Sequence, residues 1–279
     1  MQKPFVIHRY ASPAPASVNS YWIETDNSVI VIDTQRVLSQ GKLLRQQIDK
    51  VKKPIAGIII THAHPDHFSA TSALLDNGTN IPIYSSPETA LHIETDHYGL
   101  IKLGQQMLGD DYPKQVVVPN HPISSGKTFD IRGVTFQIKE MGSGEAEAMS
   151  RIHILGESIA FVGDVVNPGM HPFLLSAHIT TWIEQLNRLA TEISPDTTIY
   201  PGHGTPSIAG KLIQAQQDYL TTFRELITNQ LSDTRKLIDL NKAAIVTEIQ
   251  NKYPDYDRVA AIPTLLDMNV EAVAADLSN

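Results

Sequence analysis

One stretch of the sequence, residues 55–67, joins a fully apolar run to a dense cluster of histidines. The run IAGIII at 55–60 has the composition of a strand that is buried on both faces. THAHPDH follows it directly and holds three histidines and an aspartate. In α/β folds, functional loops lie at the carboxyl ends of such strands. The stretch therefore predicts an α/β fold with a site for chemistry in this loop.

The spacing within the loop indicates metal binding. His62 and His64 are two positions apart, so in extended backbone both side chains point the same way and can converge on one ion. Asp66 and His67 follow Pro65, where the loop turns, and face a second position nearby. One loop can thus serve two adjacent metals.

Composition narrows the chemistry. The chain has no cysteine, which excludes disulfides, thiolate catalysis and every cysteine-based metal site. Its formal net charge of -8, with scattered Lys and Arg, argues against a nucleic-acid partner. No apolar run approaches the ~20 residues of a membrane-spanning helix, and the N-terminal residues lack a signal-peptide pattern. We therefore expect a cytoplasmic protein that acts on a small molecule.

The order of predicted elements suggests two similar α/β halves in a single domain, residues 1–279. Two sheets that face each other, with helices outside, would bury both halves economically. Alternating or apolar runs predict strands at 5–10, 18–25, 28–34, 55–60, 81–86, 115–119, 127–131, 134–141, 151–155, 158–164 and 197–204. Helical periodicity or helix-start signals predict helices at 41–51, 66–76, 87–109, 179–193 and 209–230, with a helical C-terminal extension from about 231.

Two further strand ends offer ligands for a metal. AFVGDVV places Asp164 after an apolar strand and a glycine that lets the backbone turn. IYPGHG presents His203 between two glycines in the same way. With the first cluster in place, we interpret Asp164 as a carboxylate that bridges two metals rather than as a turn residue.

HAHPDH at 62–67, GD at 163–164 and PGHG at 201–204, in this order and spacing, resemble the metallo-β-lactamase superfamily. The resemblance covers roughly residues 5–225 and implies a four-layer αββα sandwich that usually holds two metals, most often zinc. The carboxylates among the candidate ligands make iron or manganese possible as well. The resemblance implies that His62 and His64 bind the first metal. It further implies that Asp66, His67 and His203 bind the second and that Asp164 bridges.

One ligand departs from the superfamily pattern. Most members place a histidine between the first motif and the bridging aspartate, but this region reads MGSGEAEAMS at 141–150. The stretch resembles the alkylsulfatase branch, in which a glutamate takes that place. Glu145 is the candidate third ligand of the first metal, with Glu147 as the alternative, and the possibility that both are solvated stays open. A glutamate coordinates zinc at about the same distance as histidine does.

Five other side chains have weaker assignments. His171, in NPGMHPF, is expected to contact substrate or assist protonation. His92 and His97 are interpreted as solvated helix positions, and His153 as part of a strand. Asp33, which ends VIVID, is expected to support the ligand loop rather than to bind metal.

These expectations converge on a metal-dependent hydrolase. Two metals ~3.5–4 Å apart would bind a bridging water and lower its pKa towards ~7, which gives hydroxide at neutral pH. Hydrolysis of an ester, thioester, lactone or related bond in a small molecule fits this chemistry, and Asp66 could shuttle the proton. A mononuclear iron dioxygenase of the same fold and a metal-stabilised, non-catalytic binding protein remain alternatives. Substrate identity and oligomeric state stay open.

The charge argument makes a prediction of its own. We expect no binding to DNA or RNA at physiological salt, because a chain of net charge -8 without a basic patch gains little from phosphate contacts. An electrophoretic mobility shift assay measures this, with a basic nucleic-acid-binding protein as positive control. A shift that weakens as salt rises would contradict the argument.

Overall fold

The computed structural model describes residues 5–75, 80–176, 178–231 and 239–278. Two six-stranded sheets form its centre. The first contains, in spatial order, β1 Val6–Ala11, β2 Asn19–Glu24, β3 Val29–Ile32, β4 Ile55–Ile59, β5 Ile83–Ser85 and β6 His121–Pro122. The second contains β13 Ser207–Ile208, β12 Thr198–Pro201, β10 Ile159–Gly163, β9 Met149–Ile154, β8 Val134–Gly142 and β7 Thr128–Ile131.

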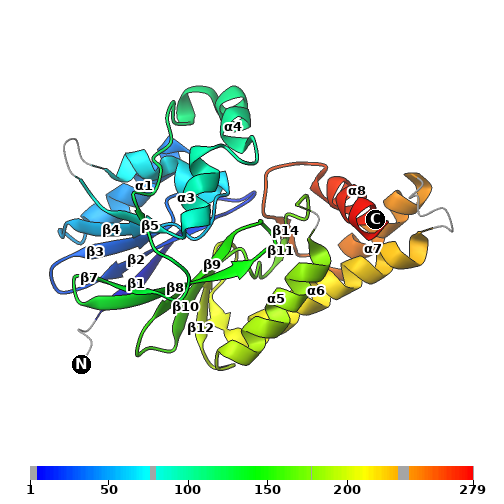
Figure 1. Ribbon diagram of the computed structural model, residues 1–279. Coiled ribbons are helices and arrows are strands. Elements are labelled where there is room, and N and C mark those ends of the chain that lie inside the picture. The colour runs from blue at the N-terminus through cyan, green and yellow to red at the C-terminus, as the bar shows by residue number, and fades with distance from the viewer. Residues whose placement is uncertain (1–4, 76–79, 177, 232–238, 279) are drawn as a thin grey trace.

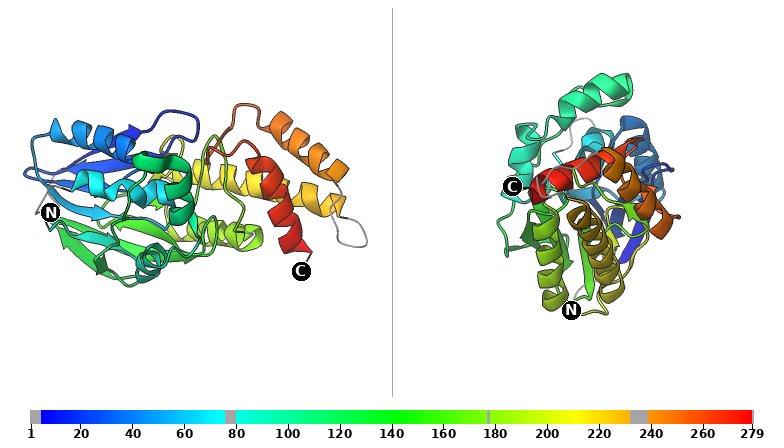
Figure 2. Two further views of the ribbon diagram at one scale, coloured as in Figure 1. Left: turned by 90° about the horizontal axis from the view of Figure 1, so that it is seen from above. Right: turned by 90° about the vertical axis from the view of Figure 1, so that its right-hand side faces the viewer.

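The two sheets pack face to face with helices on both outer sides, as Figures 1 and 2 show. The first sheet is covered by α1 Leu38–Asp49 and α3 Pro87–Glu94, the second by α5 Ile179–Glu192 and α6 Ala209–Gln230. The predicted αββα sandwich is therefore confirmed.

Strand β3 shows why the sequence forms these layers. Its side chains alternate: Ile30 and Ile32 enter the core between the sheets, whereas Val29 and Val31 pack under α1. All four are at most 1% exposed, so the strand is apolar throughout. Strand β10 behaves alike, with Phe161 between the sheets and Val162 under the outer helices.

Parallel pairing brings the predicted ligand loops to one edge. β4 pairs in parallel with β3 in the first sheet, and β10 with β12 in the second, so the loops that follow these strands leave at their carboxyl ends. A bridge between His62 and Met149 joins the two sheets at this edge. The loops that carry His62, Asp164 and His203 therefore meet.

The prediction of a continuous α-helix at 66–76 is wrong. The described part of this segment is a short α2, Pro65–Phe68, followed by a 3₁₀ helix, Ser69–Leu74. The Ala70 N–H donates to the Gln35 carbonyl, and the Thr71 and Thr34 hydroxyls share a hydrogen bond. These tertiary bonds replace the helical ones. Residue 76 lies outside the described residues.

The long helix predicted at 87–109 is broken in two. α3 ends at Glu94 and α4 spans Leu100–Leu108, and between them Asp96 and Gly99 adopt left-handed φ values of 47° and 66°. Figure 1 shows α4 standing off the sheets above α3.

The strand predicted at 115–119 is also absent. This segment is irregular, and Val116, Val117 and Val118 pack against the core beneath α1. β5 is only 3 residues long and pairs in parallel with β4 on one side and with the two-residue β6 on the other.

The described C-terminal residues form α7, Asp239–Lys252, and α8, Leu265–Leu277, joined by a long connection. This connection returns to the sheets, where β14 Asp257–Arg258 pairs in parallel with β11 Met170–His171. Val270 and Val273 of α8 join the core around α6. No helix among the described residues is long and apolar enough to cross a membrane.

Candidate metal centre

A single buried carboxylate organises the first ligand loop. Asp33, at the end of β3, accepts hydrogen bonds from the Thr61 N–H at 2.9 Å and the Thr61 hydroxyl at 2.8 Å. Its Oδ2 also lies 2.8 Å from Nδ1 of His67. Asp33 therefore holds both ends of the loop and has the supporting place expected of it.

The candidate ligands lie in two buried groups. His62, His64, Glu145 and Asp164 form one, and Asp66, His67 and His203 form the other; within each, the ligand atoms lie within 4.8 Å of one another. All seven predicted metal ligands therefore lie in these two groups.

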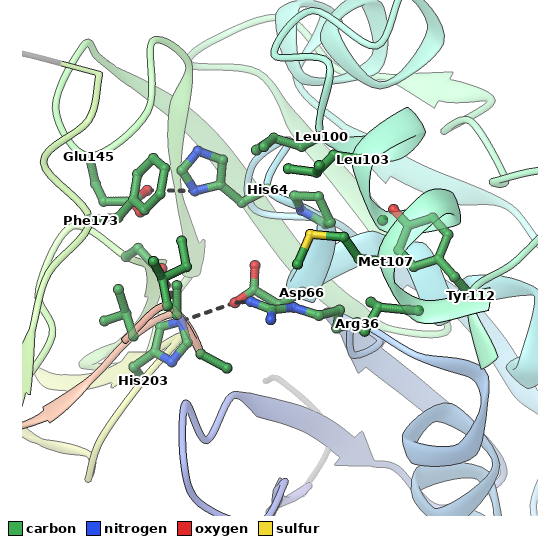
Figure 3. Close-up of a pocket in the computed structure, with 18 residues that line it drawn as sticks. Arg36, His64, Asp66, Leu100, Leu103, Met107, Tyr112, Glu145, Phe173 and His203 are labelled. Atoms are coloured by element: carbon green, nitrogen blue, oxygen red, sulfur yellow. Dashed lines mark ion pairs between the residues drawn. The ribbon is translucent and has the colours of Figure 1, made fainter. Parts of the chain in front are cut away.

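Asp164 lies between the two groups. Its Oδ2 is 4.0 Å from Nε2 of His62 and 3.2 Å from Nε2 of His203, and its Oδ1 is 3.4 Å from Nε2 of His67. Asp66 faces the same His203 nitrogen at 3.4 Å through its own Oδ2, as the dashed line in Figure 3 marks. Asp164 thus lies where a carboxylate that bridges two metals would have to lie.

Hydrogen bonds fix the orientation of three imidazoles. Nδ1 of His67 faces the Asp33 carboxylate, and Nδ1 of His203 faces the Ser17 carbonyl at 2.6 Å. Nδ1 of His62 lies 3.0 Å from the Thr61 hydroxyl, whose proton is already donated to Asp33. All three partners accept, so each Nδ1 carries the proton.

The Nε2 atoms of these three rings are buried and make no hydrogen bond. With the proton held on Nδ1, each Nε2 faces the carboxylates at the centre, where it can carry either a second proton or a metal ion. Neutral imidazoles that are oriented through their outer nitrogen are the usual ligands of zinc and related metals. The donor set thus fits a metal.

Two glycines allow the loops to approach. A Cβ on Gly202 would lie 2.0 Å from Oδ1 of Asp164 and 2.6 Å from His67, and one on Gly163 would lie 2.8 Å from the Thr61 hydroxyl. Gly163 also has a φ of 51°. The glycines predicted to turn the backbone thus also make room for the ligands.

Glu145, not Glu147, lies with the histidines. Its side chain is 1% exposed, and its Oε2 lies 2.9 Å from Nδ1 of His64 and 3.7 Å from Nε2 of His62. Glu147 is 45% exposed, and its Oε2 pairs with His97 at 2.8 Å. The geometry favours the Glu145 assignment over both of its alternatives.

Electrostatics hold the centre together against the cost of burial. Burial raises the pKa of Glu145 to about 7, although His64 lowers it. Burial would lower the pKa of His203, but the Asp164 and Asp66 carboxylates raise it to about 10. The buried carboxylates therefore favour a positive charge next to them.

His171 does not join the centre. Its ring is buried, its Nδ1 lies 2.9 Å from the Tyr219 hydroxyl, and it is not among the residues that line the cavity described below. Burial lowers its pKa to about 4. The geometry does not support the predicted contact with substrate. His153 lies in β9, as expected.

A cavity of about 210 Å³ opens beside the two ligand groups. Figure 3 shows His64, Asp66, Glu145 and His203 at its inner end. Apolar side chains form most of its wall, namely Leu100, Leu103, Met107, Leu108, Phe173, Val259, Ala260, Ala261 and Ile262. None of these side chains, nor Arg36, was singled out from the sequence, because none carries a local motif: eight of the nine come from α4 and the C-terminal connection, and Phe173 comes from the loop that follows Asp164.

The part of the chain that carries the candidate ligands is similar to known proteins. A family model described as the metallo-β-lactamase superfamily matches residues 13–204. Over 90 residues the chain is 30% identical to a probable metallo-hydrolase of Streptococcus pyogenes, a match that spans 32% of this chain and only 38% of that protein.

Two solved structures share the fold. A β-lactamase domain protein from Burkholderia ambifaria has a TM-score of 0.70 at 18% identity, covering 98% of this chain and 86% of that one. A sec-alkyl sulfatase has a TM-score of 0.68 at 17% identity, covering 92% of this chain and 46% of that one. At these identities the likeness concerns the fold alone.

The placement of Glu145 leads to a prediction. After desalting into metal-free buffer, Glu145→Ala is expected to hold one metal ion fewer per chain than the parent, because it removes the only carboxylate that serves the first group alone. Glu145→His should retain that ion, since histidine binds zinc at about the same distance. Elemental analysis against protein concentration measures both.

Glu147→Ala is the matched control, two positions away on the same loop, and should lose no ion under these conditions. If Glu147→Ala loses the ion and Glu145→Ala keeps it, the ligand assignment is wrong. Circular dichroism checks that each variant is folded.

Proposed function

Because this chain belongs to the metallo-β-lactamase superfamily, we propose that it is a metallo-hydrolase that uses two metal ions, zinc in the first place, to hydrolyse an ester, thioester or lactone that carries an apolar substituent. The observation that carries this proposal is that two buried ligand groups share Asp164 at the inner end of one cavity. The chain covers little of the curated hydrolase it matches, so the argument rests on its own residues.

The bound pair of ions would activate water and polarise the bond to be cleaved. Iron or manganese are further candidates, since a donor set with three carboxylates suits them better than one made of imidazoles alone. Asp33, Ser17 and Thr61 keep three imidazoles in the tautomer that binds metal, and so prepare the centre before substrate arrives.

Asp66 is our candidate for moving the proton. It lines the cavity, and Arg36 lies 3.5 Å from its Oδ2. Burial raises its pKa, but His67 and Arg36 overcome this and lower the pKa below the ordinary value of an aspartate. Asp66 is therefore ionised at neutral pH, and although the lowered pKa makes it a weak base, its place at the cavity would let it pass a proton from an attacking water to the leaving group.

The cavity wall points to the substrate class. α4 contributes Leu100, Leu103 and Met107 to the cavity, and none of its residues is buried, although Ile101 of the same helix packs against the core. Phe173 and Ile262 contribute to the apolar lining. A small molecule with a short alkyl or aryl group fits such a wall, and a nucleic acid does not.

A mononuclear iron dioxygenase is the alternative from the same fold. It would need one group of ligands at one ion. The second buried group, with Asp164 between the two, favours the dinuclear hydrolase. Elemental analysis that finds no metal, even after reconstitution with zinc, would refute the metal-dependent mechanism.

The shared carboxylate provides the direct test of the mechanism. Asp164→Ala is expected to reduce hydrolysis of a generic ester such as p-nitrophenyl acetate to background, because one residue organises both groups. The fold should survive, since Asp164 lies at the end of a strand rather than within the core. A folded Asp164→Ala variant that retains the parent's activity would show that the bridge is misplaced.

The apolar wall leads to a graded prediction. With p-nitrophenyl esters of increasing acyl length, kcat/KM should rise about fourfold per methylene until the cavity is filled, from ~0.8 kcal/mol for each buried CH₂. Leu103→Asn should reduce the increase in kcat/KM that each added methylene gives. Leu91→Asn, on the exposed side of α3 and outside the cavity, is the control and should leave it unchanged. Equal kcat/KM for all chain lengths in the parent protein would contradict the apolar substrate class.

A further inference from the structure

A third group of potential ligands lies on the surface, outside the centre described above. His92, His97 and Glu147 place one ligand atom each within 4.8 Å of one another. Nε2 of His97 lies 2.8 Å from Oε2 of Glu147, and the two imidazole rings stack with centroids 4.1 Å apart and planes 10° from parallel. The sequence alone had indicated only solvated helix positions for the two histidines.

The break between α3 and α4 creates this cluster. In a continuous helix, residues 92 and 97 would not stack, because positions five apart point about 140° away from each other. Here the helix ends at Glu94, the His97 N–H donates to the His92 carbonyl at 3.0 Å, and Asp96 adopts a left-handed φ of 47°. The chain thus folds back and places His97 on His92.

Glu147 reaches the cluster from the other half of the sandwich. The loop that carries it lies between β8 and β9, and the Glu147 N–H donates to the Tyr98 hydroxyl at 3.0 Å. The Tyr98 ring in turn packs against His64, with centroids 5.4 Å apart. The cluster therefore joins the α3–α4 turn to the loop of Glu145, and Tyr98 connects it to His64 of the buried centre.

The side chains suit a borderline divalent cation. Nδ1 of His92 is buried and has no hydrogen-bond partner. Burial and the neighbouring His97 lower the pKa of His92, so it is neutral at physiological pH, which is the form that binds metal. Ligand atoms around a tetrahedral zinc lie roughly 3.3 Å apart, so this cluster needs only a small contraction.

One rearrangement is required. The lone pairs of two parallel rings do not converge on one point, so one ring must turn about its Cα–Cβ bond when a cation enters. The His97 side chain is 39% exposed, so its ring can rotate into the solvent with little steric hindrance. Two imidazoles and a carboxylate, with water as fourth ligand, complete a tetrahedral set.

We propose that His92, His97 and Glu147 form a third site for a divalent transition cation such as Zn²⁺, weaker than the buried centre, which ties the Glu145 loop to the α3–α4 turn when it is filled. Nucleic-acid or anion binding at the same place is disfavoured by the Glu147 carboxylate. The site acts on the hydrolase through the position of the loop that carries Glu145.

Zinc stoichiometry tests the proposal with the full chain already loaded at its buried centre. Protein is dialysed against zinc in excess over the chain, and bound zinc is measured by elemental analysis before and after a brief wash with a weak chelator. The parent should lose one ion per chain in the wash. His97→Ala and, independently, Glu147→Gln should bind one ion fewer before the wash and lose none in it.

His121→Ala is the control, since His121 is an exposed histidine outside the cluster. It should behave as the parent does. Equal zinc in the parent and in both cluster variants would overturn the proposal, as would loss of the same ion in His121→Ala, which indicates adventitious surface binding. Both comparisons count differences from the parent, so they do not depend on how many ions the buried centre holds. A centre without metal would refute the proposed hydrolase and not this third site.

Discussion

Three carboxylates and four imidazoles, all buried, share one small volume at the edge of the two sheets. Ionised carboxylates are costly to remove from water unless opposite charge lies close by. Here Asp164 contacts imidazoles from two different loops, and Asp66 contacts His203 and Arg36. The rest of the molecule satisfies this constraint: parallel strands deliver the loops to one edge, glycines let them approach, and Asp33 keeps the first loop in place.

The parts of the site that could be predicted are those encoded locally. His62, His64, Asp66 and His67 belong to one loop after one strand, and Asp164 and His203 each follow a strand of recognisable composition. Glu145 was harder, because it follows no apolar strand end, and burial alone separates it from Glu147. In the structure Glu145 lies with the histidines, whereas the Glu147 side chain pairs with His97 and its N–H with Tyr98 on the surface.

What the sequence could not predict depends on contacts between distant segments. His171 looked like a pocket residue because it follows Asp164 closely, yet β14, almost ninety residues later, pairs with it and Tyr219 covers its ring. The helix predicted at 66–76 failed for the same reason, since the carbonyl of Gln35 takes the N–H that a helix would have used. Helical periodicity continues through residues 87–109, but it does not show where a left-handed residue interrupts it. The αββα architecture could be predicted nonetheless, because apolar strands dominate both sheets.

The connection between α7 and α8 has a consequence for how such a protein changes over time. It supplies residues 259–262 to the cavity wall, whereas the family match ends at residue 204 and includes every ligand of the buried centre. Part of the cavity wall thus lies on a stretch of the chain that is separate from the metal ligands, and the two-residue pairing of β14 with β11 holds that stretch in place. Substitutions in the C-terminal connection could therefore change which small molecules the cavity accepts, while the metal ligands stay the same.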